Sequence, residues 1–117
     1  MDKRPIGIFD SGVGGITVLK EIKETLPKEN IIYLGDTKNF PYGNKSKEDI
    51  IKFSIDNVQK LLKQNVKTIV IACGTATSQA IEVLKEKFDI PIIGIIEPTV
   101  KYIKNQKFDK VGVIATE

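Results

Sequence analysis

The sequence of 117 residues has no histidine and only one cysteine, and these two scarcities exclude most familiar kinds of catalytic site. Without His, the chain cannot by itself form an imidazole-based triad, a zinc site with His ligands or an imidazole acid–base pair. A single Cys cannot form an internal disulfide. Any chemistry within the chain must therefore come from thiol, hydroxyl, carboxylate, amine or backbone groups.

Long hydrophobic runs are also missing. The longest apolar runs, Thr68 to Cys73 and Ile90 to Ile96, have the length of strands and are far too short to span a bilayer. Near the amino terminus, the apolar run that precedes Asp10 is too short for the core of a signal peptide. We therefore expect a cytoplasmic protein without a membrane segment, in which the thiol stays reduced.

The charge balance is not extreme either. Lys and Arg number 18 against 15 Asp and Glu, which gives a net charge of +3, and 41% of the residues are hydrophobic. These values are close to globular averages and give little reason to expect a nucleic-acid partner. A chain of this length fits one domain, which would bury roughly 65% of the surface that its unfolded chain exposes.

Short β-rich runs alternate with segments of helical period, a pattern typical of βαβ units. The predicted strands are Pro5 to Phe9, Asn30 to Leu34, Lys67 to Ala72, Pro91 to Ile96 and Lys110 to Ala115. Each is nearly continuous in Ile, Val or Phe, as expected of strands buried on both faces. The sequence therefore predicts an α/β fold, a single three-layer α/β/α domain with a doubly wound, flavodoxin-like parallel sheet.

Apolar periodicity predicts the helices between these strands. The apolar stripes are Leu19, Ile22 and Leu26; Ile51, Ile55, Val58 and Leu62; and Ile81, Leu84 and Phe88, with a short fourth helix from Thr99 to Lys104. Ser46 and Asp49 resemble a capping box that opens the second helix. Lys and Glu fill the remaining faces, as expected of solvated helix surfaces.

Ligands of open parallel sheets bind beyond the carboxyl ends of the strands, so the residues that follow each strand are the candidates for chemistry. These segments are Asp10-Ser11-Gly12-Val13-Gly14-Gly15, Gly35-Asp36-Thr37 with Pro41-Tyr42-Gly43, Cys73-Gly74-Thr75-Ala76-Thr77, Glu97-Pro98-Thr99 and Thr116. Carboxylates, hydroxyls and a thiol are thus expected at one edge of the sheet, beside helix N-termini that attract anions.

Cys73 has two interpretations. A lone Cys is often a small buried apolar residue. Cys73, however, stands at a strand-to-helix turn, followed by Gly74 and Thr75, where backbone amides and the helix dipole favour the thiolate. A structural Cys would more naturally lie inside the strand, beside Ile69 and Ile71. We therefore favour a functional thiol.

Asp10 and the turn residues are ambiguous when taken singly. Asp10 can cap a helix through its carboxylate, or it can steer a proton beside Cys73 as part of a general-base pair. The glycines Gly12, Gly14 and Gly15 either let the backbone approach a ligand closely or form a tight turn that needs positive φ. By local physics alone, the segment from Pro41 to Gly43 is a β-turn.

Two generic alternatives fit less well. In a dinucleotide site, the third glycine counted from Gly12 would fall on Thr17, and Asp10 would face the pyrophosphate. A phospho-accepting receiver domain would need an acidic residue after the third strand and a lysine after the fifth. This chain has Cys73 and Thr116 at those places.

Four segments together resemble the amino-terminal half of the glutamate racemases, in the aspartate/glutamate racemase superfamily. They are IGIFDSGVGGITVL, YLGDT..FPYG, VIACGTAT and PIIGIIEP, in this order and at this spacing. The resemblance covers essentially the entire chain. The D-S-G-x-G-G, P-Y-G and A-C-x-T-A segments are weak singly and highly specific in combination.

The resemblance implies interconversion of L- and D-glutamate without a cofactor or metal, supplying D-glutamate for bacterial peptidoglycan. In this family two cysteines face opposite sides of the substrate Cα, and one thiolate removes a proton while the other thiol returns one. By this resemblance, Cys73 would deprotonate D-glutamate with help from Asp10. The residues implied in substrate binding are Ser11, Pro41, Tyr42, Gly43, Gly74, Thr75 and Thr116.

The sequence departs from the family pattern in two ways. Gly74 stands where the family usually has Asn, which removes a side-chain amide expected to bind substrate. The second cysteine, expected in a Cys-Thr-His motif of a carboxyl-terminal half, is absent together with the histidine. We therefore expect residues 1–117 to form an amino-terminal domain with half of the site, inactive alone. Its expected partners are glutamate, the missing carboxyl-terminal half and, as a further candidate, a second copy in a homodimer.

Two other functions remain open at this point. Aspartate racemase, or another superfamily member, would use the same carbon-acid chemistry on a different substrate. A non-catalytic module that binds a small anion or a nucleotide would use the same sheet edge, although Asp10 beside the glycine loop argues against it.

Overall fold

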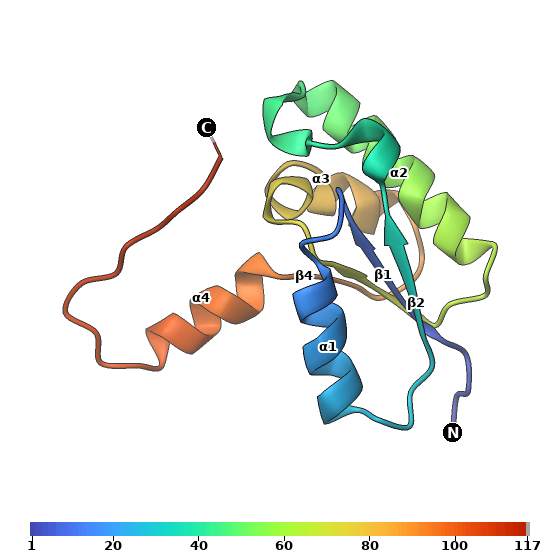
Figure 1. The fold of residues 1–117 in the computed structure, drawn as a ribbon, viewed down its shortest axis with the longest axis horizontal. Coiled ribbons are helices and arrows are strands. Elements are labelled where there is room, and N and C mark those ends of the chain that lie inside the picture. The colour runs from blue at the N-terminus through green and yellow to red at the C-terminus, as the bar shows by residue number, and fades with distance from the viewer. Residues whose placement is uncertain (117) are drawn as a thin grey trace.

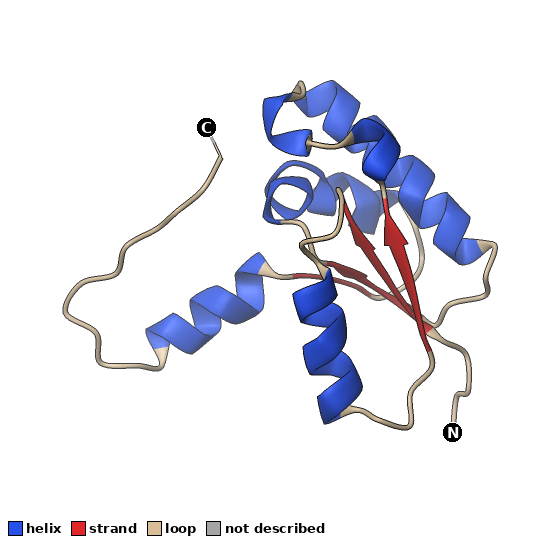
Figure 2. Cartoon of the chain, viewed as in Figure 1, coloured by secondary structure: helices blue, strands red, loops and turns tan. Residues whose placement is uncertain are grey.

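A four-stranded parallel sheet forms the centre of the protein in a computed structural model that describes residues 1–116 (Figure 2). Its strands are β1 (Ile6–Asp10), β2 (Ile31–Gly35), β3 (Thr68–Ile71) and β4 (Ile92–Gly94), in the order β2-β1-β3-β4. Ile8 lies opposite both Tyr33 and Val70, so β1, β2 and β3 end near the same level. This order and direction confirm the predicted doubly wound parallel fold.

Helices lie on both faces of this sheet (Figure 1). The longer ones are α1 (Ile16–Thr25), α2 (Lys47–Leu62), α3 (Gly74–Lys87) and α4 (Ile96–Lys104), and two single turns are η1 (Thr37–Asn39) and η2 (Tyr42–Asn44). The predicted N-cap of α2 is confirmed, because the Ser46 hydroxyl accepts a hydrogen bond of 3.1 Å from the backbone N–H of Asp49.

Side-chain alternation along the strands divides the core between the two faces. Phe9, Ile69 and Ile71 are buried against α2 and α3 in the larger apolar cluster. Ile8 and Ala72 point to the opposite face and pack with the apolar residues of α1. The two central strands, β1 and β3, are therefore packed from both sides.

The prediction that every strand is buried on both faces is wrong for the outer strands. β2 is half-buried throughout, and Ile93 in β4 is 50% exposed. The reason is the uneven cover of the sheet: α1 packs over β1 and β2, and no residue of α4 is buried against the remaining part of that face.

The predicted fifth strand is also wrong. Residues 110–115 have no strand structure and are exposed, with Val113 at 84% and Ile114 at 103% relative exposure. The helix α4 begins at Ile96 rather than at Thr99, and it leads the chain away from the sheet (Figure 1). The segment after α4 is therefore not brought to the free edge of β4, where a fifth strand would have to pair.

Within residues 1–116, none of the helices is both long enough and apolar enough to cross a membrane.

Candidate active site at the carboxyl edge of the sheet

Cys73 lies at the junction of β3 and α3. It is 7% exposed and serves as the N-cap of α3, because the N–H of Ala76 donates to its Sγ at 3.4 Å. Its carbonyl accepts bonds from the N–H of Thr77 at 2.9 Å and from the Thr77 hydroxyl at 2.8 Å. On its other side, the thiol lies 3.6 Å from the Ser11 hydroxyl and can donate to it. The thiol thus begins a helix and meets the loop after β1.

Asp10 is buried at the end of β1 and holds the glycine loop together. Its Oδ2 accepts hydrogen bonds from the N–H groups of Gly12 at 3.2 Å and Gly15 at 3.0 Å. The Tyr33 hydroxyl lies 3.5 Å from the same oxygen and donates to the Gly12 carbonyl at 3.0 Å. Burial and the negative charge of Asp10 raise the pKa of Tyr33 to about 12, so this phenol remains a donor.

Asp10 is not the N-cap of α1, because that helix begins after Gly15 and has no side-chain cap in the described part of the chain; the Asp10 carboxylate binds the preceding loop instead. Within residues 1–116, Asp10 and Cys73 share no hydrogen bond, and the group beside the sulfur is Ser11. The Oδ1 atom of Asp10 has no hydrogen-bond partner in the same part of the chain. The predicted proton-transfer role of Asp10 therefore stays a prediction.

The glycines of this loop serve close packing rather than a left-handed turn. No glycine among residues 1–116 has a positive φ, so the positive-φ alternative for Gly12, Gly14 and Gly15 is wrong. A Cβ on Gly15 would lie 2.8 Å from the Cβ of Ala72, and one on Gly12 would lie 2.8 Å from the Phe40 ring. Gly14 is open by comparison, since the nearest atom to its Cβ would be 3.9 Å away.

The β-turn predicted from Pro41 to Gly43 is displaced along the chain, because the observed turn begins at Tyr42 rather than at Pro41. The turn is the single 3-10 turn η2, closed by a 3.0 Å bond from the N–H of Lys45 to the Tyr42 carbonyl, and Pro41 is exposed just before it. The 3-10 turn leaves Gly43 inside the bend, where its missing side chain allows Thr116 to approach.

The Tyr42 side chain points into the core rather than toward a ligand. It is 1% exposed, its hydroxyl donates to the Asp36 carboxylate, and it accepts a 2.8 Å bond from the amide of Asn57. Burial, followed by the Asp36 carboxylate, raises the pKa of Tyr42 well above its ordinary value. Any contact of Tyr42 with a substrate at this edge would therefore use its backbone.

Four backbone N–H groups near the thiol have no acceptor within residues 1–116: those of Tyr42, Gly43, Gly74 and Thr75. They belong to the first turns of η2 and α3, where N–H groups have no partner inside the helix. These two elements lie against each other. Such donors suit a carboxylate, and their position beside a thiol allows proton transfer at the neighbouring carbon.

Thr116 reaches this edge although the strand predicted before it is absent. Its hydroxyl lies 3.1 Å from that of Thr75, and a Cβ on Gly43 would meet the Thr116 methyl group at 2.7 Å. The segment after α4 therefore reaches the first turns of α3 and η2 through Thr116. Of the predicted site residues, the structure thus gathers Ser11 with Cys73, and Gly43 with Thr75 and Thr116.

Gly74 is exposed and has open space around it. A Cβ at this position would meet no atom within 4 Å, among all parts of the chain that the structure describes. The departure from the family's Asn therefore leaves room at the site without any packing requirement for glycine.

Sequence reasoning missed the polar residues that anchor Tyr42. The sequence places Asp36 among the candidates that follow the second strand but gives it no partner, and it does not single out Asn39 or Asn57. One signal was available for Asn57, which lies next to Val58 on the buried face of α2 where an apolar residue is expected.

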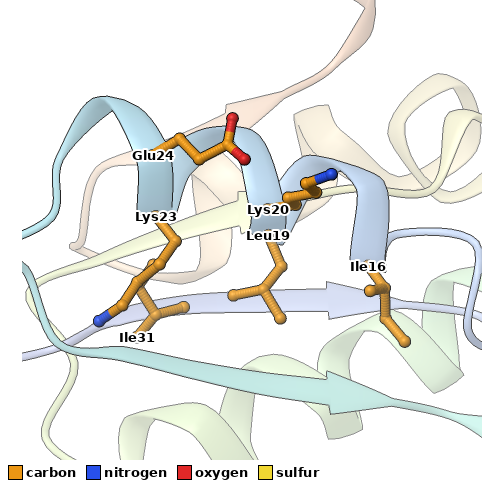
Figure 3. Close-up of a pocket in the computed structure, with 6 residues that line it drawn as sticks. All are labelled: Ile16, Leu19, Lys20, Lys23, Glu24 and Ile31. Atoms are coloured by element: carbon orange, nitrogen blue, oxygen red, sulfur yellow. The ribbon is translucent and has the colours of Figure 1, made fainter.

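A separate groove lies away from the thiol. A groove of about 550 Å³ runs between α1 and β2, and its lining residues are Ile16, Leu19, Lys20, Lys23, Glu24 and Ile31 (Figure 3). Ile16 and Leu19 point from α1 toward the strands, whereas Glu24 points away from them. The groove is a gap at the edge of the α1 layer and contains none of the predicted site residues. Among residues 1–116, no group of three or more His, Cys, Asp and Glu is placed to hold a metal ion.

Comparison with known proteins gives one consistent result. The profile of the Asp/Glu/Hydantoin racemase family matches residues 6–117. The chain is 54% identical to the glutamate racemase of Lactococcus lactis subsp. cremoris strain MG1363, over 100% of this chain and 44% of that protein. The glutamate racemase of Persephonella marina is 51% identical over 96% of this chain and 44% of its own length. The chain thus spans less than half the length of these relatives.

Solved structures agree with the fold. The crystal structure of glutamate racemase from Francisella tularensis in complex with D-glutamate superimposes with a TM-score of 0.85 at 43% identity, covering 91% of this chain and 40% of that one. The Thermus thermophilus enzyme in complex with beta-chloro-D-alanine gives a TM-score of 0.84 at 44% identity, covering 90% of this chain and 41% of that one.

Proposed function

Because the chain belongs to the Asp/Glu/Hydantoin racemase family, we propose that it supplies half of the active site of a cofactor-independent glutamate racemase. The reaction would interconvert L- and D-glutamate by removing the α-proton on one face and returning a proton on the other. Relatives named glutamate racemase, at up to 54% identity over the whole chain, support the choice of substrate.

The observation that carries the proposal is the Cys73 thiol at the start of α3, together with the uncommitted backbone N–H groups of α3 and of the turn η2 that lies against it. In this proposal, the thiolate removes the α-proton of D-glutamate, and the N–H groups of Gly74 and Thr75 bind a substrate carboxylate. As the carbanion develops, its charge spreads onto the α-carboxylate. Fixed donors aimed at that charge lower the barrier without reorganising during the reaction.

Ser11 and Asp10 would support the thiol from the β1 side. The Ser11 hydroxyl lies 3.6 Å from the sulfur and can accept a hydrogen bond from the S–H group, which orients the thiol. The free Oδ1 of Asp10 would steer the ammonium group or the transferred proton, while Oδ2 remains committed to the loop. Thr116 would complete the binding of the substrate beside Thr75.

We propose that the acid on the opposite face of Cα comes from outside residues 1–117. Cys73 is the only cysteine of the chain, and the chain covers 44% of the curated relatives. The proposed source is the carboxyl-terminal half of those relatives, and the alternative is a second copy of this chain. The exposed apolar residues Ile93, Val100 and Val113 support a partner that would cover them.

The cellular role would be the supply of D-glutamate for peptidoglycan, and hence for cell wall synthesis and cell shape, in the cytoplasm. A second candidate is racemisation of aspartate or a hydantoin, because the family profile carries all three substrates in its description. The same thiol and N–H groups would serve each, so the contacts on the distal part of the substrate would decide between them.

One assay separates these candidates. The chain would be joined to the carboxyl-terminal portion of the Lactococcus lactis relative and assayed with both enantiomers of glutamate, aspartate and hydantoin substrates. We expect turnover of glutamate and its loss in Cys73→Ser. The matched control Val83→Ser changes an exposed position of α3 and should leave turnover unchanged. Turnover of aspartate alone would replace the glutamate assignment, and turnover that survives Cys73→Ser would contradict the role of the thiol.

A further inference from the structure

The carboxylate of Asp36 is buried at the end of β2 and is fully engaged in hydrogen bonds. It is 7% exposed, and its two oxygens accept bonds of 3.1 and 3.0 Å from the side-chain amide of Asn39. The Tyr42 hydroxyl donates to the same carboxylate. A buried Asp is rare unless it is paired, and bonds to an ionised acceptor are stronger than neutral ones. The Asp36 carboxylate therefore holds in place the side chains that donate to it, those of Asn39 and Tyr42.

One of these donors, Tyr42, belongs to the turn η2, which carries two of the uncommitted N–H groups, whereas Asn39 ends the preceding turn η1. Two further contacts hold Tyr42: the Asn57 amide donates to its hydroxyl, and the Phe53 ring packs against its ring at a centroid distance of 5.6 Å. With the side chain anchored, the backbone of Tyr42 and Gly43 has little freedom to rotate. Their N–H groups have no acceptor within residues 1–116.

Asp36 is also joined to the loop on the other side of the candidate site. Its own N–H donates to the carbonyl of Asp10 at 2.9 Å, which continues the pairing of β1 with β2 beyond the strands. One residue thus connects the Asp10 loop, through its backbone, with the η2 turn, through its side chain. The catalytic scheme proposed above makes no use of Asp36.

We infer that Asp36 is a positioning residue that holds the backbone N–H groups of Tyr42 and Gly43 toward a carboxylate of the substrate bound beside Cys73. The inference rests on the proposed function, since it needs a carboxylate-bearing substrate at this edge. Asp36 touches no reacting atom in this scheme; it acts through Tyr42. Loss of the carboxylate lets the phenol leave its buried position, and the turn no longer presents its two donors together.

The test uses amide NMR spectra of the 117-residue chain during titration with D-glutamate. In the wild-type chain we expect the amide signals of Tyr42, Gly43, Gly74 and Thr75 to shift together. In Asp36→Asn we expect the Tyr42 and Gly43 signals to stop responding, with affinity weaker by roughly tenfold, while Gly74 and Thr75 still respond. The matched control Asp56→Asn, at an exposed position of α2, should behave as the wild type.

A purely structural role would not divide the four signals in this way, because unfolding removes every response at once. If Asp36→Asn does not fold, Tyr42→Phe makes the same test, since it keeps the ring and removes only the hydroxyl that binds Asp36. The same selective loss is then expected. Equal responses of all four amides in a folded variant would overturn the inference alone. A wild-type chain that responds nowhere would overturn the proposed function, and the inference with it.

Discussion

At the residue scale, the Cys73 side chain has two structural roles: it packs in the apolar core and it caps α3. Cys73 packs with buried apolar residues of the core, and its sulfur also accepts a hydrogen bond from the N–H of Ala76 in the first turn of α3. A larger residue would disturb the packing, and an aliphatic one would leave that N–H without a partner. The site is therefore part of the folding core rather than an addition to its surface.

Gly74 offers a direct test of how much freedom the site retains. Gly74→Asn should change the free energy of unfolding by no more than about 0.5 kcal/mol, because its Cβ would meet nothing within 4 Å. Gly94→Asn is the matched control: its Cβ would collide with the Thr77 methyl group, so we expect a cost of about 1–3 kcal/mol. Urea unfolding of both variants measures the difference. Equal losses of unfolding free energy in the two variants would show that the surroundings of Gly74 are as crowded as those of Gly94.

Tyr33 should make the stability of the chain depend on pH in the alkaline range. Its pKa is raised from 10.0 to about 12, because burial and Asp10 favour the neutral phenol. The resulting stabilisation is fully present below the unfolded value of 10.0 and is lost as the pH rises toward about 12. We expect the free energy of unfolding of Tyr33→Phe to fall less than that of the wild type across this window. Urea unfolding of both proteins at each pH measures this difference. An equal fall of the free energy of unfolding with pH in both proteins would contradict the prediction.

Part of the site could be predicted from residues alone. Cys73, Thr75 and the Asp10 loop follow strands directly, and the rule for parallel sheets brings such residues to one edge. The contact of Tyr42 with Asp36 and Asn57 could not be predicted, because it depends on how the turn η2 packs on α2. The backbone angles of the glycines were equally hidden, since a glycine needed for close approach and one needed for positive φ look the same in a sequence.

At the element scale, the helices and strands from β1 to α3 follow their sequence signals closely. The apolar stripes, the Ser46 cap and the β-rich runs all agree there, and each element has a partner on which to pack. Beyond β4 the signals are still strong, yet α4 buries none of its residues. The sequence 110–115 has β propensity, but a strand forms only where an open edge receives it.

This difference predicts contrasting responses to substitution. Val113→Lys and Ile114→Lys should each change the free energy of unfolding by less than about 0.5 kcal/mol, because both side chains are exposed. Ile71→Ala, in the fully buried part of β3, should cost about 2–5 kcal/mol. Thermal or urea unfolding of the 117-residue chain compares them. A cost at Val113 close to that at Ile71 would show that this segment joins the sheet after all.

At the scale of the whole molecule, one layer of the sandwich is incomplete within residues 1–116. The face that carries Ile93 is covered by α1 only on the side of β1 and β2, and α4 stands away from it (Figure 1). The candidate site is incomplete in a similar way, since its thiol and N–H groups all lie at the carboxyl edge of the sheet and would contact a substrate from that side only. A substrate carbon held there would be accessible from the opposite face.

The 117-residue chain alone should therefore not racemise glutamate at an appreciable rate. The optical rotation of D-glutamate incubated with the purified chain should stay constant, whereas the chain joined to the carboxyl-terminal portion of a relative should change it. Sustained turnover by the isolated chain, lost in Cys73→Ser, would contradict the half-site proposal. If the joined protein stays inactive, Gly74→Asn in that protein tests whether the missing amide is the cause.

The most direct measurement is exchange of the α-hydrogen of D-glutamate with deuterium from the solvent, followed in the joined protein. We predict exchange by the wild-type sequence and a loss of about 10²-fold or more in Cys73→Ser, because an acid–base group that touches the reacting carbon is removed. Val83→Ser should retain the full rate. Exchange at the wild-type rate in Cys73→Ser would contradict the central claim that this thiol removes the proton.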